Sequence, residues 1–325
     1  MTWVLWQQQR RQALMVIAAL ALATLFLIVT GQHLASTYAA AVHGCAGRAG
    51  GCGDLSQTVF QGDNRLFDIV DAVGFLLPFV LGLFWGAPLV TREFEEGTHR
   101  LAWTQSITRL RWLAVKLLWV LLAAVLCSGA LSALVTWWYG PVNAVQQNRF
   151  GSVIFDTQGI VPAAYAVFAV AAGVLAGAVL RRTVPAMAVT FAVFGVIRYV
   201  VDEFVRPHLL AAERITVGIA ASFGNAPAGN GSWVLGTTLM TPGGRPLATP
   251  GGKIDPGSLP PACRQVFYSD SKLARCMSAH GFRAVVSYQP ASRYWPFQWT
   301  EAAIYLSAAA LAAVLACWWV TRRDA

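Results

Sequence analysis

The stretch LFDIVDAVGFLLPFVLGLFWGAPLV, Leu66–Val90, is followed directly by the charged stretch TREFEEGTHR, Thr91–Arg100. About 20 apolar residues in a helix are enough to cross the hydrocarbon core of a bilayer, so Leu66–Val90 is long enough to do so. The charged stretch is then expected at a membrane surface, because charged side chains are costly inside the bilayer. A transmembrane helix that ends in a charged segment is therefore the unit from which we predict the fold.

The same pattern recurs along the rest of the chain. Of the 325 residues, 56% are hydrophobic and only 12% are charged, and the mean hydropathy is +0.54. A soluble domain carries about 25% charged residues, so this composition is that of a membrane protein. We predict an all-α polytopic membrane protein whose six spans are about Ala13–Thr30, Leu66–Val90, Trp112–Tyr139, Ile160–Leu180, Val184–Val201 and Trp299–Val320.

The first apolar run could be mistaken for a signal peptide, because Arg10 and Arg11 precede it. Its apolar core is longer than the roughly 7–15 residues of a signal core, which favours an uncleaved first span.

The distribution of Lys and Arg predicts the orientation of these spans. With both termini in the cytoplasm, the two short outer loops hold only Arg48, Arg65 and Arg149, as the positive-inside rule requires. The basic residues that would then face the cytoplasm are Arg10, Arg11, Arg92, Arg100, Arg109, Arg111, Lys116, Arg181, Arg182, Arg322 and Arg323. The net charge of +9 accompanies no dense basic cluster and no nucleic-acid motif, so we expect no nucleic-acid partner.

The charged stretch after Leu66–Val90 has helical periodicity of its own. Val90, Phe94, Gly97 and Leu101 recur at helical spacing, and charged residues surround them. We predict a short amphipathic helix at about residues 91–103, lying near the inner membrane interface. A solvated cytoplasmic loop would explain the same spacing. The polar residues that follow, Thr104, Ser106 and Thr108, can cap the next helix with their hydroxyl groups.

An enzymatic interpretation also exists for this stretch. Glu95-Glu96-x-x-x-Arg100 matches the EExxxR signature of intramembrane CAAX-type proteases, and Phe204-x-x-x-His208 resembles their second motif. A catalytic site needs its groups within hydrogen-bond reach. The predicted orientation instead separates the two motifs by a bilayer core of ~30 Å, which argues against the protease.

Two segments resemble a transporter family. REFEEGTHRLAWTQSITRLRWL, which begins at Arg92, is similar to the cytoplasmic segment between the second and third spans of type-2 ATP-binding-cassette (ABC) permeases, particularly the actinobacterial exporter-like group. MSAHGFRAVVSYQPASRYWPFQWTEAAIYL, which begins at Met277, resembles the segment before their last span. Where many relatives have Pro in the turn, this chain has Gln105-Ser106-Ile107.

The resemblance implies the permease subunit of an ATP-driven exporter in a bacterial cell membrane. Such a permease moves a lipophilic or amphipathic compound outward, assembles with a second permease copy, and contacts membrane lipid. Its energy comes from a separate ABC ATPase subunit, which binds the ATP and Mg²⁺. No G-x-x-x-x-G-K-[ST] phosphate loop occurs in this chain, so we expect it to bind no cofactor itself. A permease relative that signals or assembles something at the envelope is a further alternative.

The family motif also identifies candidate residues for contact with the ATPase. Arg92 and Glu96 stand four residues apart and are predicted to pair on one helix face, while Gly97 would allow close backbone approach or end a turn. Carried over residue by residue, the coupling candidates are Arg92, Glu93, Phe94, Glu95, Glu96, Gly97, Thr98, Arg100 and Leu101.

Four charged residues in or near the spans are candidates for a transport path or for salt bridges. Asp68 and Asp71 share a face near the outer start of the second span, where negative charge also suits a helix N-terminus. Arg198 lies near the outer end of the fifth span, where it can extend to the interface or pair with Asp68, Asp71 or Glu301.

Residues 202–297 are too long for a simple connection, and we predict a small exterior domain between residues 1–201 and the last span with its tail, 298–325. SWVLGTTLM and FRAVVSYQ are typical of strands, and Ser269–His280 of a short helix that Gly281 ends. Of the three possible pairings of the outer cysteines, the simplest joins Cys45 to Cys52 and Cys263 to Cys276. A zinc site formed by His33, His43, Cys45 and Cys52 fits no standard spacing.

Overall fold

The computed structural model describes residues 2–45, 64–97, 108–146, 149–222, 228–229, 231–247, 256–267 and 270–323. Within these residues, six helical segments are long and apolar enough to cross a membrane, which confirms the all-α polytopic fold class. They are Val16–Ala41, Arg65–Glu95, Arg109–Trp138, Val161–Leu180, Thr183–His208 and Ala291–Arg322.

The chain divides into two compact units, which we call the helical unit and the sheet unit. The helical unit comprises residues 1–146, 152–206 and 298–325. Its elements are α1 (Thr2–Cys45), α3 (Asn64–Leu81), η1 (Gly82–Gly86), α4 (Pro88–Glu95), α6 (Arg109–Trp138), α7 (Gly140–Gln146), α8 (Ser152–Thr157), α9 (Val161–Leu180), α10 (Thr183–Val200), η2 (Val201–Val205) and most of α14 (Tyr294–Arg323).

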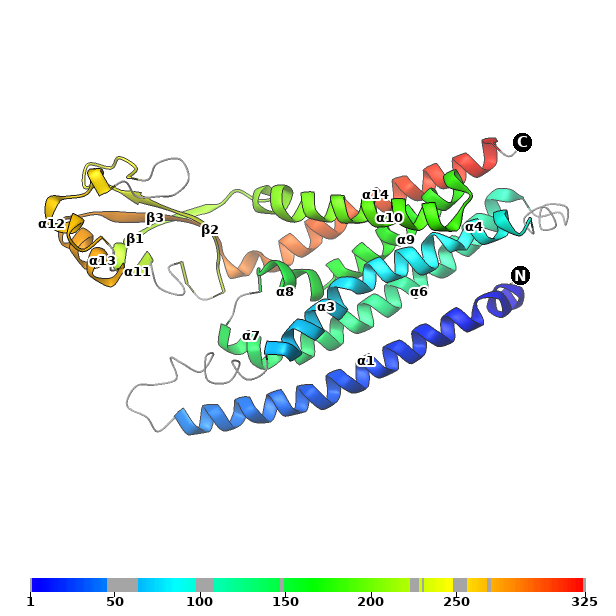
Figure 1. The fold of residues 1–325 in the computed structure, drawn as a ribbon, viewed down its shortest axis with the longest axis horizontal. Coiled ribbons are helices and arrows are strands. Elements are labelled where there is room, and N and C mark those ends of the chain that lie inside the picture. The colour runs from blue at the N-terminus through cyan, green and yellow to red at the C-terminus, as the bar shows by residue number, and fades with distance from the viewer. Residues whose placement is uncertain are drawn as a thin grey trace. The chain divides into compact units, whose positions relative to one another are not determined.

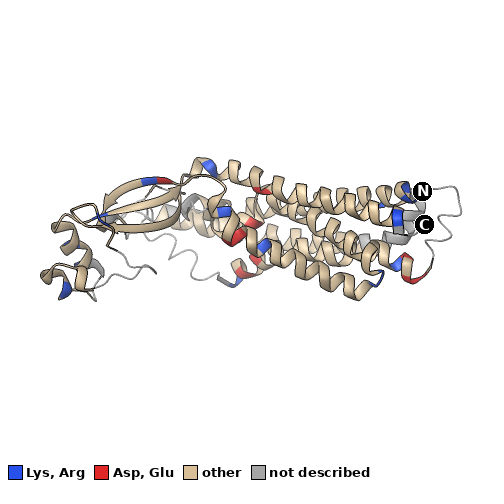
Figure 2. Ribbon diagram, turned by 90° about the horizontal axis from the view of Figure 1, so that it is seen from above, with Lys and Arg blue, Asp and Glu red and all other residues tan. Residues whose placement is uncertain are grey.

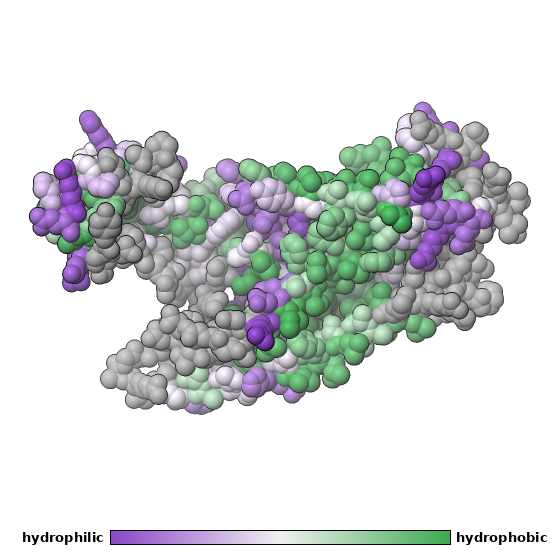
Figure 3. Space-filling model, in the orientation of Figure 1, coloured by the Kyte–Doolittle hydropathy of each residue, from purple (hydrophilic) through white to green (hydrophobic). Residues whose placement is uncertain are grey.

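Within the helical unit, the start of α1, the end of α14 and α4 lie at the same end (Figure 1). Apolar side chains cover the middle of the visible face, and hydrophilic ones gather toward its ends (Figure 3). This is the surface expected of a bundle whose middle faces hydrocarbon.

Two glycine pairs bring the second and fourth spans into close contact. Gly82-x-x-x-Gly86 lies at the end of the second span, and Gly173-x-x-x-Gly177 lies in α9. A methyl group added at Gly173 would lie 2.7 Å from the backbone nitrogen of Ala87, and one at Gly177 would lie 2.8 Å from the Ala87 oxygen. The two motifs therefore pack α9 against the end of the second span inside one chain, as small residues do between membrane helices.

The first span was expected at Ala13–Thr30, but the apolar segment of α1 continues to Ala41. The fifth and sixth spans are also longer than hydropathy predicts. The fifth was expected to end at Val201, but the helix continues through the π-helical turn η2 into the 3₁₀ turn η3 (Arg206–His208). The sixth was expected to begin at Trp299, and α14 begins at Tyr294. Charged residues lower the hydropathy of these ends, yet Arg206 at the end of the fifth span is buried among partners described below.

The sheet unit comprises residues 147–151 and 207–297. In it, β3 (Arg283–Gln289) pairs antiparallel with both β1 (Glu213–Gly218) and β2 (Trp233–Met240), giving the strand order β1-β3-β2. The short helices are α11 (Ile219–Ser222), α12 (Pro261–Arg264) and α13 (Asp270–Ala279). The strands predicted from SWVLGTTLM and FRAVVSYQ correspond to β2 and β3, and the predicted helix corresponds to α13. The strand β1 was not predicted.

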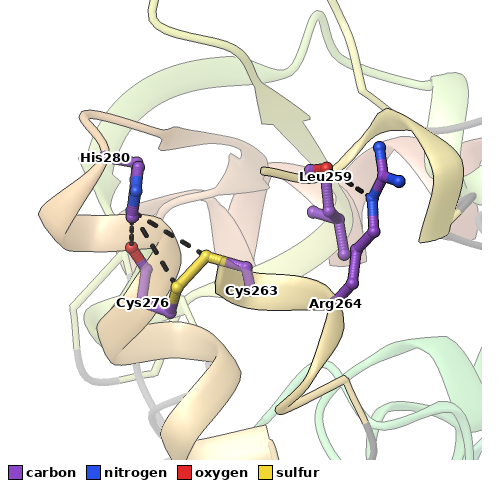
Figure 4. The surroundings of a disulfide bond; sticks show 5 residues. All are labelled: Leu259, Cys263, Arg264, Cys276 and His280. Carbon is purple, nitrogen blue, oxygen red and sulfur yellow. Dashed lines mark hydrogen bonds between the residues drawn. A yellow bond between two sulfur atoms is a disulfide. The ribbon is translucent and has the colours of Figure 1, made fainter. Parts of the chain in front are cut away.

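A disulfide bond joins α12 to α13 in the sheet unit. Cys263 and Cys276 are bonded, with their Cα atoms 5.6 Å apart, as the spacing predicted. His280 lies beside them (Figure 4), its Nδ1 atom 2.9 Å from the carbonyl oxygen of Cys276. The other predicted disulfide involves Cys52, which lies outside the described residues, so Cys45–Cys52 stays a prediction.

Candidate functional site

The charged stretch that follows the second span begins as part of that span. The elements α3, η1 and α4 form one continuous segment, Arg65–Glu95. The helix then stops: the Glu96 N–H donates to the Arg92 carbonyl at 2.9 Å, and Gly97 has a positive φ of 70°. Glycine adopts this left-handed conformation without the strain that other residues incur.

The structure describes only the first part of the helix predicted at about residues 91–103. Residues 91–95 form the last turn of the second span, and this turn ends before Gly97. Residues 98–103 lie outside the described residues, so a helix there stays a prediction. The coupling candidates Thr98, Arg100 and Leu101 lie outside the described residues. The next described helix, α6, begins after Thr108, whose hydroxyl oxygen accepts a hydrogen bond from the Arg111 N–H at 3.3 Å. The predicted capping role of Thr108 is thereby confirmed.

Glu95 faces the neighbouring helix α10. Its carboxylate accepts two hydrogen bonds from Thr183, one from the backbone N–H and one from the hydroxyl, each 2.8 Å long. Thr183 is the first residue of α10, and its hydroxyl also lies 2.8 Å from that of Thr91 in α4. A carboxylate at a helix N-terminus satisfies an otherwise unpaired N–H and interacts favourably with the helix dipole. Glu95 therefore ties the end of the second span to the start of the fifth.

Glu93 faces α6 instead. It forms an ion pair with Lys116, and the two side chains are 14% and 7% exposed. The Lys116 ammonium also lies 4.6 Å from the ring centroid of Trp112 in the same helix. A largely buried ammonium needs such partners, because losing its hydration is costly. This pair ties the end of the second span to the start of the third.

The turn between α9 and α10 contacts α4 as well. Arg181 ends α9 in a left-handed conformation with φ 55°, and its guanidinium lies 5.5 Å from the ring centroid of Phe94. Three consecutive residues of α4 therefore contact three other parts of the helical unit: Glu93 contacts α6, Phe94 contacts the turn between α9 and α10, and Glu95 contacts the start of α10.

The remaining described candidates are open to solvent. Arg92, Glu96 and Gly97 are exposed. Both residues are described, and the predicted ion pair between the side chains of Arg92 and Glu96 does not form. The two residues are connected instead through the backbone hydrogen bond from the Glu96 N–H to the Arg92 carbonyl. The coupling candidates thus divide by their contacts. An inward set, Glu93, Phe94 and Glu95, touches neighbouring helices, although Glu95 is also exposed to solvent, and an exposed set, Arg92, Glu96 and Gly97, does not bond to the described residues of those helices.

A second group of charged residues lies at the opposite end of the helical unit, and Figure 2 shows charged residues gathered toward both ends. Arg206 is 1% exposed and donates to both carboxylate oxygens of Glu301, at 2.7 and 2.8 Å. It also forms ion pairs with Asp156 in α8 and with Asp202, one helical turn earlier. We call Asp156, Tyr165, Arg198, Arg206 and Glu301 the buried charge network.

The other members of the network complete these contacts. Arg198 donates to Asp156 at 3.1 Å and to the Phe75 carbonyl at 3.1 Å. The Tyr165 hydroxyl lies 3.0 Å from Asp156 and also contacts Glu301. The carboxylates of Asp156 and Glu301 balance the two guanidinium groups in charge, and the partly exposed Asp202 adds a third carboxylate at the edge. Each buried charge has a partner, as buried charges require. The network joins α8, α9, the fifth span and α14.

The four charged residues predicted as transport-path or salt-bridge candidates lie in different surroundings in the structure. Arg198 and Glu301 belong to the same network, linked through residues that the sequence analysis did not single out: Asp156, Tyr165 and Arg206. Asp71 instead accepts a hydrogen bond from the Tyr139 hydroxyl, and Asp68 is exposed. Arg198 therefore pairs with Asp156 and not with Asp68, Asp71 or Glu301. The i,i+4 spacing of Asp202 and Arg206 was the available signal that this segment continues as a helix.

The two protease-like motifs lie at opposite ends of the fifth span. Glu95 binds Thr183 at its start, and His208 stands at its end. At 1.5 Å per residue, the helix between them is roughly 35 Å long. This distance is far beyond hydrogen-bond reach, so Glu95 and His208 do not form one catalytic site.

Comparison with protein families gives one result for this chain. A family model described as ABC-2 membrane transporter related matches residues 17–206, more than half of the chain. The matched region includes α4, the turn between α9 and α10, and the members of the buried charge network that precede α14. Comparisons with curated proteins and with solved structures gave no match.

Proposed function

Because this chain belongs to the ABC-2 membrane transporter related family, we propose that it is the permease subunit of an ATP-driven exporter. It is a multi-pass membrane protein, consistent with the cell membrane, and the described part of the chain holds six helices that are long and apolar enough to span a bilayer. The observation that best supports the proposal is the division of α4. Its exposed set can meet a partner, while its inward set is bonded to the third and fifth spans.

In the proposed mechanism, a separate ATPase subunit with bound ATP and Mg²⁺ docks on Arg92, Glu96 and Gly97. A displacement of α4 would reach α6 through the Glu93–Lys116 ion pair. It would reach α10 through the hydrogen bonds between Glu95 and Thr183. Packed helices with hydrogen-bonded ends transmit such movement as rigid elements. The spans would then tilt from inward to outward access.

We further propose that two such permeases assemble with two ATPases and export a lipophilic or amphipathic compound. The apolar side chains exposed along α1, α6 and α10 suit contact with lipid, with a second copy or with such a compound. We propose the orientation predicted from the distribution of Lys and Arg. The end of the helical unit that carries α4 then faces the cytoplasm, and the sheet unit lies outside.

Crosslinking tests the docking surface. The permease is co-expressed with a candidate ABC ATPase, and a single cysteine is placed at Glu96 (Glu96→Cys) or, as the matched control, at Asp68 (Asp68→Cys). Both positions are exposed and stand near opposite ends of the second span. Glu96→Cys should crosslink to the ATPase and Asp68→Cys should not.

A functional readout accompanies the crosslink. Glu96→Arg reverses a charge at the proposed contact and should reduce ATP hydrolysis by the purified complex while membrane insertion stays normal. Purification of the permease with no ATPase, or equal crosslinking at both cysteines, would refute the proposed function.

A further inference from the structure

A groove runs between three spans of the helical unit. It lies between α9, α10 and α14 and has a volume of about 430 Å³. This is within the range of roughly 300–1,000 Å³ that is usual for small-molecule sites. Its rim includes Val189, Leu311 and Leu315, whose exposed fractions are 43%, 61% and 41%. The groove therefore opens on the surface of the spans, where the surrounding solvent is the hydrocarbon of the bilayer.

The lining restricts what the groove can bind. Of the described residues that line it, only Thr190 has a polar side-chain atom. The Thr190 hydroxyl donates to the Ala186 carbonyl of its own helix at 2.7 Å, so its hydrogen-bonding need is already met. A polar group placed in the groove would lose its hydration without gaining a partner, which is costly. The part of a ligand that enters must be hydrocarbon.

One end of the groove leads to arginines. Leu180 lines the groove and directly precedes Arg181 and Arg182, and Arg182 is exposed. On α14, Leu315 lines the groove, and Arg322 follows it by two turns, about 10 Å at 1.5 Å per residue. Arg322 is exposed, and its guanidinium lies 5.5 Å from the ring centroid of Trp318. Helices on both sides of the groove thus end in exposed basic residues at the end that carries α4.

We propose that this groove binds an anionic phospholipid, with one acyl chain between α9, α10 and α14 and the phosphate near Arg182 and Arg322. An apolar groove that leads to exposed guanidinium groups complements a molecule with a hydrocarbon tail and a negative head. Basic residues at the membrane surface are attracted to anionic lipids, and arginine binds phosphate in a planar fork. The occupant is a lipid of the surrounding leaflet, and the inference does not depend on what the permease exports.

Native mass spectrometry of the full chain in mild detergent tests the proposal, with 1-palmitoyl-2-oleoyl phosphatidylglycerol and the matching phosphatidylcholine as probes. Wild type should retain one phosphatidylglycerol per chain and prefer it to phosphatidylcholine. Ala308→Phe and Ala312→Phe fill the groove and should weaken retention roughly tenfold, since excluding two methylenes already has about that effect. Ala130→Phe, at an exposed alanine of α6 away from the groove, is the matched control and should bind as wild type does.

The head group is tested separately. Arg182→Gln combined with Arg322→Gln should abolish the preference for phosphatidylglycerol while leaving phosphatidylcholine binding unchanged. Equal retention of phosphatidylglycerol by wild type and both groove-filling variants would overturn the proposal. A change in the ratio of one chain to two, with lipid retention unaltered, would also overturn it and assign the groove to a second copy.

A labelling experiment on wild type covers the case in which the groove-filling variants fail to fold. A phosphatidylglycerol with a diazirine in one acyl chain should label residues of α9, α10 and α14 that line the groove. Competition by unlabelled phosphatidylglycerol, but not by phosphatidylcholine, should reduce that labelling. Labelling confined to other helices would overturn the assignment.

Discussion

The two ends of the helical unit both concentrate charged side chains but use them differently. At one end, Arg206 and Glu301 are 1% and 0% exposed and are bonded to each other. At the other, Arg92 and Glu96 are exposed beside Glu93 and Glu95, which bond to neighbouring helices. The buried charge network at one end, which we call the closed end, is therefore shielded from solvent, while the other end presents charges on a segment that is held by neighbouring helices.

This difference suits the two ends to different roles: one holds the helices in place, and the other can pass on a displacement. A buried ion pair resists rearrangement, because separating its members leaves uncompensated charge away from water. An exposed charge contributes little to stability and remains available to a partner. The closed end is thus suited to hold α8, α9, the fifth span and α14 together, and the α4 end is suited to receive a partner.

The largest effect is expected at the closed end. Glu301→Ala removes the carboxylate that accepts two hydrogen bonds from Arg206 and leaves that guanidinium without its main partner. Breaking a buried ion pair in this way costs about 3–5 kcal/mol of unfolding free energy. Unfolding of the purified protein in detergent measures the loss, and Glu96→Ala, at an exposed carboxylate, is the control. Equal stability of the two variants would contradict the comparison between the two ends.

An intermediate effect is expected at the Glu93–Lys116 pair, which is more exposed than the network. Lys116→Met keeps the length of the side chain but leaves Glu93 without its ammonium partner. We expect a loss of about 2 kcal/mol, between the values typical of exposed and fully buried pairs. The double variant Lys116→Met with Glu93→Leu should recover part of this loss, because no unpaired charge remains. The same unfolding measurement applies, and a double variant less stable than Lys116→Met would contradict the explanation.

Hydropathy was sufficient to predict the spans, because each needs a long apolar run whatever its neighbours are. It was not sufficient to predict where the first and fifth spans end or where the sixth begins. At the end of the fifth span the sequence has charged residues such as Asp202 and Arg206, which are typical of a loop unless a partner neutralises them. Those partners include Asp156 and Glu301, which are 50 and 95 residues from Arg206 in sequence. The buried charge network depends on such long-range pairs, which no local pattern specifies.

The coupling candidates show a similar limit of prediction from sequence. The family motif directed attention to the last turn of the second span, where the structure finds both inward and exposed charges. Periodicity placed Gly97 inside a helix, but its positive φ ends the helix instead. That Glu95 caps α10 depends on the approach of Thr183, 88 residues away in sequence. The sequence analysis could therefore predict the segment, but not which of its carboxylates face inward.

A smaller effect on stability is expected where Glu95 caps α10. Glu95→Ala leaves the Thr183 N–H without its acceptor and removes a favourable charge from the start of α10, so the helix end is destabilised slightly. We expect the variant to bind the ATPase normally but to show reduced substrate-stimulated ATP hydrolysis, because the link to the fifth span is lost. Thr108→Ala removes a cap of α6 that does not involve α4 and is the matched control. Normal stimulation in Glu95→Ala would remove the inward set from the mechanism.

The smallest effect on stability, and the sharpest test of the exposed set, is expected at Arg92. Arg92→Ala should change the unfolding free energy by no more than about 0.5 kcal/mol, because exposed side chains contribute little. It should weaken ATPase binding by roughly 1.5- to fivefold, the range for one exposed ion pair. Arg65→Ala, at an exposed arginine near the other end of the same span, is the control and should leave binding unchanged. Titration of the ATPase against both variants measures the difference, which should shrink as salt rises because exposed charges are screened. If Arg92→Ala and Arg65→Ala weaken binding equally, or if salt leaves the difference intact, then Arg92 does not form the proposed contact and the α4 end loses its distinction from the closed end.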